Sequence, residues 1–192
     1  MQIRKQNDND VSHSVMLHNT LFPEDPITEK LLLNMKRLRS DFCHYGDSLG
    51  EVDGQVVASA SYYQNSGSYH PNRFGLDIKV LKEYRNQGIG TAMYEHLLTM
   101  LAPFDPRQLR VYTRSNRKEA LRFLEKRGYT VYSEIAFSTL YVPDCDLSQF
   151  DGLHEKVQKT GVVITTLSER LQNDPDIYRK ISDADWEITR DE

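Results

Sequence analysis

The sequence has few of the residues that build disulfide frameworks or metal sites. Its 192 residues include two cysteines, Cys43 and Cys145, and six histidines that do not recur at metal-ligand spacings. No apolar run approaches the roughly 18 residues that a membrane helix needs, and residues 1–6 lack the hydrophobic stretch of a secretory leader. We therefore expect a cytoplasmic protein with no metal and no membrane segment.

Intrinsic disorder is excluded by the composition, and the charge is unevenly placed. Hydrophobic residues make up 39% of the chain, which includes 11 tyrosines and 7 phenylalanines. Residues 79–127 carry 11 basic and 5 acidic side chains, although the whole chain has a net charge of −4. Such a segment is either a solvated helix face or a site for a polyanionic small molecule. A nucleic-acid partner is not expected, because the chain is acidic and has no tract rich in Lys and Arg.

Hydrophobic periodicity and turn residues predict alternating strands and helices. Asp53-Gly54 favours the tight turn of a hairpin, Asp25-Pro26 is typical of a helix start, and Asn116 with Glu119 predicts a capping box. The predicted strands lie at 3–6, 49–52, 55–63, 74–80, 109–113 and 129–137, and the predicted helices at 11–16, 26–38, 89–101 and 117–127. This order indicates a mixed α/β layer with helices on both faces of a sheet.

One motif, Arg85-x-x-Gly88-x-Gly90, carries chemistry and lies between a predicted strand and a predicted helix. The first turn of a helix leaves backbone N–H groups without partners, and the helix dipole adds positive charge there. The glycines let a phosphate approach the backbone, and Arg85 can add a charge-assisted hydrogen bond. The motif therefore predicts a pyrophosphate site, although a plain turn that needs glycine is the alternative. It is not a Walker A loop, and Met93 stands where a dinucleotide fingerprint has its third glycine.

The segment around this motif, residues 78–92, resembles the GCN5-related N-acetyltransferase (GNAT) family, whose R/Q-x-x-G-x-G/A signature is intact here. Residues 116–129 are similar to the same family in the spacing of an Asn, an Ala, an aromatic residue and a Gly-aromatic pair. The resemblance covers roughly residues 2–142. It implies a mostly antiparallel central sheet with a splay between two central strands. It also implies direct acetyl transfer from acetyl-CoA to an amine, without a covalent enzyme intermediate.

The resemblance also implies roles for single residues. The backbones of Ile78 and Val80 would bind the pantetheine arm of acetyl-CoA, and Asn116 would contact it near the thioester. Arg117 or Lys118 could reach the 3′-phosphate. The pyrophosphate would be held by Arg85 and by the amides of Gln87, Gly88, Ile89, Gly90 and Thr91.

The catalytic residues are less well marked than the cofactor site. Leu124 stands where many family members have a tyrosine as general acid, and no glutamate lies on the strand before the signature. Asp77 is the only carboxylate there, and Tyr112 and Tyr129 are candidate acids. Each has a plain alternative, because Asp77 could pair with a neighbouring Lys or Arg and the tyrosines could simply pack. A thiolate leaving group needs little acid help, since a thiol has a pKa of about 8.5.

Residues 143–192 form an acidic extension to the domain expected over 1–142. The pattern predicts a helix that ends at Gly161, a strand at 162–166 and a helix after Asp174-Pro175. This resembles the start of a second GNAT-like domain. The predicted strand would add to a sheet within the chain or across a homodimer, because a lone strand leaves an unpaired edge.

Three functions follow from these observations. The first is an N-acetyltransferase for a primary amine of a small molecule or a protein. The second is a non-catalytic acyl-CoA-binding or regulatory domain, which the missing tyrosine and glutamate favour. The third is a protein-interaction module whose acidic tail recruits a basic partner. By the resemblance, the loop at 64–73 helps to form the acceptor cleft, and Glu24, Asp25 and Asp41 either attract a cationic acceptor or are ordinary surface carboxylates.

Overall fold

The computed structural model describes residues 1–189. The chain forms two compact units, and the boundary between them in the sequence lies between Thr130 and Val131. The strands of the first unit are β1 (Gln2–Lys5), β2 (Tyr45–Val52), β3 (Gln55–Tyr63), β4 (Arg73–Val80) and β5 (Gln108–Val111). Its α-helices are α1 (Val11–Leu21), α2 (Glu29–Arg37), α3 (Ile89–Leu101) and α4 (Lys118–Glu125). The second unit contains α5 (Leu153–Lys159), α6 (Leu167–Leu171) and α7 (Ile177–Thr189).

Short 3-10 turns connect several of these elements. They are η1 (Asp8–Asp10), η2 (Ser66–Ser68), η3 (Lys82–Tyr84), η4 (Ala102–Phe104), η5 (Val142–Asp144) and η6 (Ser148–Phe150). Among the described residues, no helix is long and apolar enough to cross a membrane.

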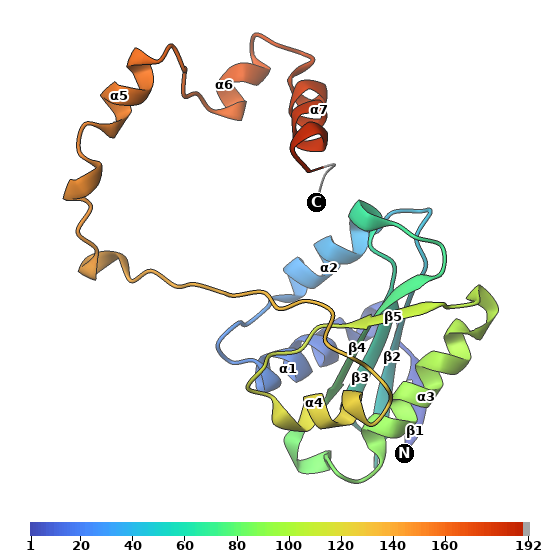
Figure 1. The fold of residues 1–192 in the computed structure, drawn as a ribbon. Helices are drawn as coiled ribbons and strands as arrows, with labels where there is room; N and C mark the ends of the chain where they lie inside the picture. Colours follow the sequence, from blue (N-terminus) through green and yellow to red (C-terminus); the bar gives the residue numbers. More distant parts are fainter. Residues whose placement is uncertain (190–192) are drawn as a thin grey trace. The chain divides into compact units, whose positions relative to one another are not determined.

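The described strands form one five-stranded sheet in the order β1-β2-β3-β4-β5 (Figure 1). Neighbouring strands from β1 to β4 are antiparallel, and β4 pairs with β5 in parallel. The pairing of β4 with β5 stops at Leu76 and Val111, while β4 continues to Val80. The predicted α/β class with a mostly antiparallel sheet is therefore confirmed, and the splay lies between β4 and the edge strand β5.

The two faces of the sheet are covered by helices from different parts of the chain. Helix α3 packs against β2, β3 and β4, and its Met93 and Leu97 are fully buried with Phe74. Helix α1 contacts β3 and β4 from the other side of the sheet, where Leu17 is fully buried (Figure 1). Burial of such apolar side chains is the main stabilising contribution to the unit.

The hairpin turn follows the sequence closely. Asp53 has a φ of 50° and Gly54 a φ of 79°, which is the left-handed pair that a type I′ turn requires. Glycine adopts this conformation without strain, and aspartate tolerates it better than most residues. The predicted turn between β2 and β3 is confirmed.

Two predicted strands do not form. Residues 130–141 adopt no regular structure, and Val131, Ile135 and Phe137 are exposed. An alternating pattern makes a strand only where another strand offers ladder hydrogen bonds, and no described strand pairs with this segment. The expected domain border at 142 depended on that strand, whereas the first compact unit ends at Thr130.

The predicted strand at 162–166 is wrong for a local reason. Thr166 Oγ1 accepts from the Glu169 amide, and Glu169 Oε2 accepts from the Thr166 amide. This capping box starts α6 and ends the extended segment. The described part of the second unit contains helices and no strand, so the strand-mediated homodimer loses its basis.

The start of α2 also differs from the prediction. The helix begins at Glu29 rather than at Pro26, and Thr28 is its N-cap. The Asn19 side chain bonds both the amide and the carbonyl of Ile27, at 2.8 and 3.0 Å. These bonds hold Ile27 outside the helix.

Candidate active site

The turn before α3 presents a row of backbone amides with no acceptor in the described part of the chain. Gly88 is the N-cap of α3, with a φ of 83°, and the first bond of the helix runs from the Ala92 amide to the Gly88 carbonyl at 3.0 Å. No described residue accepts a hydrogen bond from the amides that precede Ala92, namely those of Gln87, Gly88, Ile89, Gly90 and Thr91. An exposed helix N-terminus of this kind suits an anion.

The two glycines of the motif have different structural reasons. Gly88 needs its positive φ, and a Cβ there would meet nothing within 4 Å. At Gly90, a Cβ would lie 3.5 Å from Phe123 and 3.9 Å from Val80, which is ordinary contact. Gly90 therefore keeps open the space between β4 and α4, and a side chain longer than alanine would enter it.

Arg85 lies between this turn and α4. Its Nε donates to the Val80 carbonyl at 3.2 Å, and its Nη1 donates to Glu119 Oε2 at 3.3 Å. Exposed ion pairs of this kind contribute less than about 1 kcal/mol, so an anionic ligand can replace the carboxylate. The predicted capping box between Asn116 and Glu119 is wrong. The Glu119 side chain forms an ion pair with Arg85 instead. The N-cap of α4 is Arg117, and no side chain caps this helix.

A second cation at this turn was missed by the sequence reasoning. Arg127 donates from Nη2 to Thr91 Oγ1 at 2.7 Å, and its guanidinium carbon lies 3.5 Å from the centre of the Phe123 ring. The only sequence signal was its place in the basic segment. Arg117, in contrast, lies over the Phe22 ring at 4.2 Å and is held at the end of α1.

The part of β4 that follows Leu76 has no strand beside it on the β5 side, so its main-chain groups on that edge have no ladder partners. The Leu81 amide donates to Val57 on the β3 side, whereas the Val80 carbonyl accepts from Arg85 and so faces the opposite edge. Main-chain groups of successive strand residues point to alternating edges. The main-chain N–H and C=O groups of Ile78 and Val80 therefore point toward the splay.

A cavity of about 100 Å³ lies in this splay, between β4, the end of β5, α3 and α4. Its walls are largely apolar and include Ile78, Phe123 and Leu124. The cavity thus adjoins the open edge of β4. Leu124, which stands where the family resemblance suggests a tyrosine, is one of its lining residues.

The three candidate catalytic residues are placed differently. Asp77 lines the cavity but forms an ion pair with Lys79, which is the plain alternative considered for it. Tyr112 is exposed and also lines the cavity. Tyr129 does not line it: its hydroxyl lies 3.4 Å from that of Tyr94, and burial together with this hydrogen bond raises the pKa of Tyr129.

Tyr94 is the lining residue that the sequence did not reveal. It sits on α3 one turn after Gly90 and lines the cavity, and its hydroxyl lies 3.4 Å from that of Tyr129. Nothing in the linear pattern separates it from the other tyrosines. Among the described residues, no group of three or more His, Cys, Asp or Glu side chains could hold a metal ion.

A second cavity, of about 280 Å³, shares Tyr112 with the first. It is formed by β3, β4, β5 and the loop after β3, and its lining residues include Asn65 and Ser68. The loop at 64–73 thus contributes to a cavity, and its part in an acceptor cleft stays a prediction. Glu24 forms ion pairs with Arg114 and Arg117 and lines neither cavity.

A family model described as the acetyltransferase (GNAT) family matches residues 14–129, which is more than half of the chain. The chain belongs to the GNAT acetyltransferase family. The matched segment contains the turn before α3, the splay and α4. No curated protein matches the sequence.

Solved structures show the same GNAT fold at low sequence identity. The aminoglycoside acetyltransferase AAC(6′)-Iy, in complex with a bisubstrate analogue that contains CoA, is 18% identical, with a TM-score of 0.57 over 72% of this chain and 97% of that one. An acetyltransferase from Trypanosoma brucei is also 18% identical, with a TM-score of 0.54 over 72% and 99%. Ard1 from Thermoplasma volcanium is 20% identical, with a TM-score of 0.57 over 69% and 84%.

Proposed function

We propose that this GNAT domain is an N-acetyltransferase that moves an acetyl group from acetyl-CoA to a primary amine. The observation that carries the proposal is the row of amides before α3, which have no acceptor among the described residues and adjoin the open edge of β4. Bound acetyl-CoA would supply the acetyl group as a thioester. Its phosphates and its pantetheine arm match the two parts of this surface.

The turn before α3 would hold the pyrophosphate. The amides of residues 87–91 donate to its oxygens, and the positive end of the helix dipole adds to the attraction. Arg85 would give up its hydrogen bond to Glu119 and donate to the pyrophosphate instead. Arg127 adds a second guanidinium beside Thr91. This arrangement supplies positive charge without a metal ligand set.

The splay would hold the pantetheine arm. Ile78 and Val80 offer main-chain donors and acceptors to its amides, and Phe123 and Leu124 offer apolar contact. We propose that Asn116, which is exposed ahead of α4, contacts the arm near the thioester. The reactive carbonyl would then lie at the end of β5, beside Tyr112.

Acetyl transfer at this position would depend mostly on positioning. Freeing the lone pair of an alkyl ammonium at pH 7 costs roughly 4–5 kcal/mol, since its pKa is about 10.4. Holding the two reactants together can lower the barrier by about 7–11 kcal/mol. Asp77 is the carboxylate nearest to accept the proton, once Lys79 releases it, and Tyr112 can donate to the leaving sulfur. Tyr129 would act only through Tyr94.

A non-catalytic acyl-CoA-binding domain is the second candidate. It is favoured by Leu124 in the wall of the cavity and by the ion pair that holds Asp77. Both features leave fewer side chains that could transfer a proton, and neither removes a group that we propose to bind CoA.

Calorimetry and a thiol-release assay distinguish these functions. We expect the full chain to bind CoA and to release free thiol from acetyl-CoA when a suitable amine is present. Binding of CoA with no thiol release for any amine in a broad panel would support the non-catalytic domain. Absence of CoA binding would contradict both candidates and leave a protein-interaction module as the alternative.

A further inference from the structure

The second cavity has a cationic character that the linear sequence does not show. Two arginines line it, Arg73 on β4 and Arg110 on β5, together with Tyr63 and Tyr112. None of its lining side chains is acidic. Among the ion pairs of the described residues, none involves Arg73.

Strand register brings these residues to one face of the sheet. Gly75 of β4 lies opposite Tyr63 on one side and Arg110 on the other, and residues in register share a face. Arg73 is two residues before Gly75 and therefore lies on the same face. Gln108, opposite Arg73, accepts from its Nε at 2.8 Å and fixes the guanidinium at the rim.

Gly75 makes room for this arrangement. A Cβ on Gly75 would overlap the ring of Tyr63, so only glycine lets that ring lie across β4. Burial raises the pKa of Tyr63, and Asp77 and Tyr112 raise it further, so its hydroxyl remains a donor at neutral pH. The cavity is thus lined by phenol groups and by the Arg73 guanidinium, which bonds the neutral side chain of Gln108, around a space smaller than a typical drug-sized site.

We propose that this cavity binds the carboxylate of the acceptor, and that the acceptor is an amino acid or another small amine that carries a carboxylate. The inference rests on the proposed function, because the cavity meets the acetyl-CoA site at Tyr112. A planar guanidinium matches a carboxylate by paired, charge-assisted hydrogen bonds.

The same charges select against other acceptors. Positive neighbours disfavour a protonated amine, so the bound amine more readily presents the neutral form that attacks a thioester. A polyamine has no carboxylate to offset this repulsion and is excluded. The acidic residues that suggested a cationic acceptor do not contradict this, since Glu24 is paired with arginines outside the cavity.

Matched ligands test the proposal by binding rather than by turnover. Leucine, phenylalanine, lysine and glutamate are each titrated beside the corresponding α-carboxamide, into the full chain alone and into the chain saturated with CoA. We expect at least one amino acid to bind tenfold or more tightly than its amide. Equal or weaker binding of the acid in every pair would overturn the proposal.

Substitutions then locate the effect. Arg73→Gln and Arg110→Gln should each bring the acid-to-amide ratio near one, while Arg73→Lys should keep part of the preference and the Kd for CoA should stay unchanged in all three. A preference that survives both glutamine variants would overturn the assignment to this cavity. Failure of CoA to bind would refute the proposed function separately, because the titration into the chain alone still decides the carboxylate site.

Discussion

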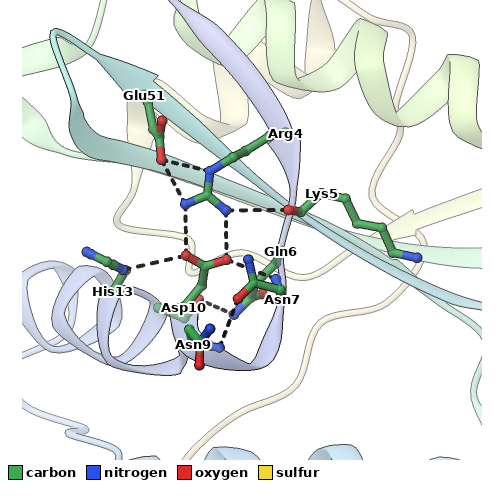
Figure 2. A network of polar contacts seen from close by, with 9 residues as sticks. Arg4, Lys5, Gln6, Asn7, Asn9, Asp10, His13 and Glu51 are labelled. Carbon is green, nitrogen blue, oxygen red and sulfur yellow. Dashed lines mark hydrogen bonds and ion pairs between the residues drawn. The ribbon is translucent and has the colours of Figure 1, made fainter.

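Asp10 shows how a single side chain fastens the edge of the sheet to the first helix. It is buried, with 6% of its side chain exposed, and it accepts two hydrogen bonds from Arg4 at 2.7 and 2.8 Å (Figure 2). Arg4 also donates to Glu51 of β2, and the Asn7 amide donates to Asp10 at 2.9 Å. The Arg4 guanidinium lowers the pKa of Asp10 to about 2. The network therefore joins β1, β2 and the start of α1.

Replacing Asp10 by Asn should lower stability in a pH-dependent way. Since the pKa of Asp10 is lower in the folded chain than in the unfolded one, its ionised form stabilises the fold above about pH 4, and this stability is lost as the pH falls toward 2. We expect Asp10→Asn to cost roughly 1.5–3 kcal/mol at pH 7, as for hydrogen bonds to charged groups. Urea unfolding at several pH values measures it. Asp8→Asn, at an exposed position on the same turn, is the control, and an equal loss in both variants would contradict the role of the network.

Arg85 and Glu119 should affect CoA binding in opposite directions. Arg85→Gln removes a guanidinium from the pyrophosphate site, and we expect the Kd for CoA to rise about tenfold or more. Glu119→Gln frees Arg85 from an exposed ion pair, so the Kd should stay equal or fall by up to about fivefold. Calorimetric titration measures both.

The matched control for Arg85→Gln is Arg122→Gln, which makes the same charge change on an exposed part of α4. It should leave the Kd within about twofold, since a charge outside the site is screened by salt. If Arg122→Gln weakens binding as much as Arg85→Gln does, Arg85 makes no specific contact with the ligand.

At the scale of elements, the first turn of α3 provides a test of the main-chain donors alone. Thr91→Pro removes one amide N–H. Proline is tolerated there because Thr91 lies in the first turn of α3, where an amide N–H makes no hydrogen bond within the helix. Thr91→Ala keeps the amide and, like the proline variant, loses the hydroxyl that accepts from Arg127. We expect the proline variant to bind CoA about three- to tenfold more weakly than the alanine variant. Equal Kd values, with similar melting temperatures, would show that this amide does not bind the phosphates.

The same elements show which features a sequence can reveal. The turn before α3 and the hairpin at Asp53-Gly54 depend on conformations that glycine itself favours, so local residues predicted them. The strand expected through Phe137 needs hydrogen bonds from another strand, and no local pattern says whether one is available. At 162–166 the run of β-branched residues predicted a strand, but its last residue, Thr166, forms a capping box with Glu169 and starts a helix instead.

The candidate site divides in the same way. The pyrophosphate turn is contiguous in the sequence, so its residues could be named from the motif. Arg73 and Arg110 lie 37 residues apart and meet only through the parallel register of β4 with β5. Tyr94 and Arg127 are brought to the site by their contacts with Phe123 of α4, which periodicity does not specify.

At the scale of the whole molecule, the basic segment at 79–127 is only partly available to a ligand. Arg107 pairs with Asp105 and Arg114 pairs with Glu24. Arg127 instead bonds two neutral groups, the Thr91 hydroxyl of α3 and the Phe123 carbonyl of α4. The chain as a whole carries a net charge of −4. Attraction of a polyanion therefore depends on short-range charge near the turn, because an acidic molecule repels it at longer range.

For this reason, added salt should weaken the contacts with the phosphates of CoA more than the contacts with its pantetheine arm. Raising NaCl from about 0.05 to 0.5 M shortens the Debye length from roughly 14 to 4 Å, so exposed charges interact less. We expect the Kd for CoA to rise roughly three- to tenfold and that for acetylpantetheine, which has no phosphates, to stay within about twofold. Arg127→Gln should reduce the salt dependence for CoA alone. Parallel curves for the two ligands would mean that the turn before α3 does not hold the phosphates, whatever binds in the splay.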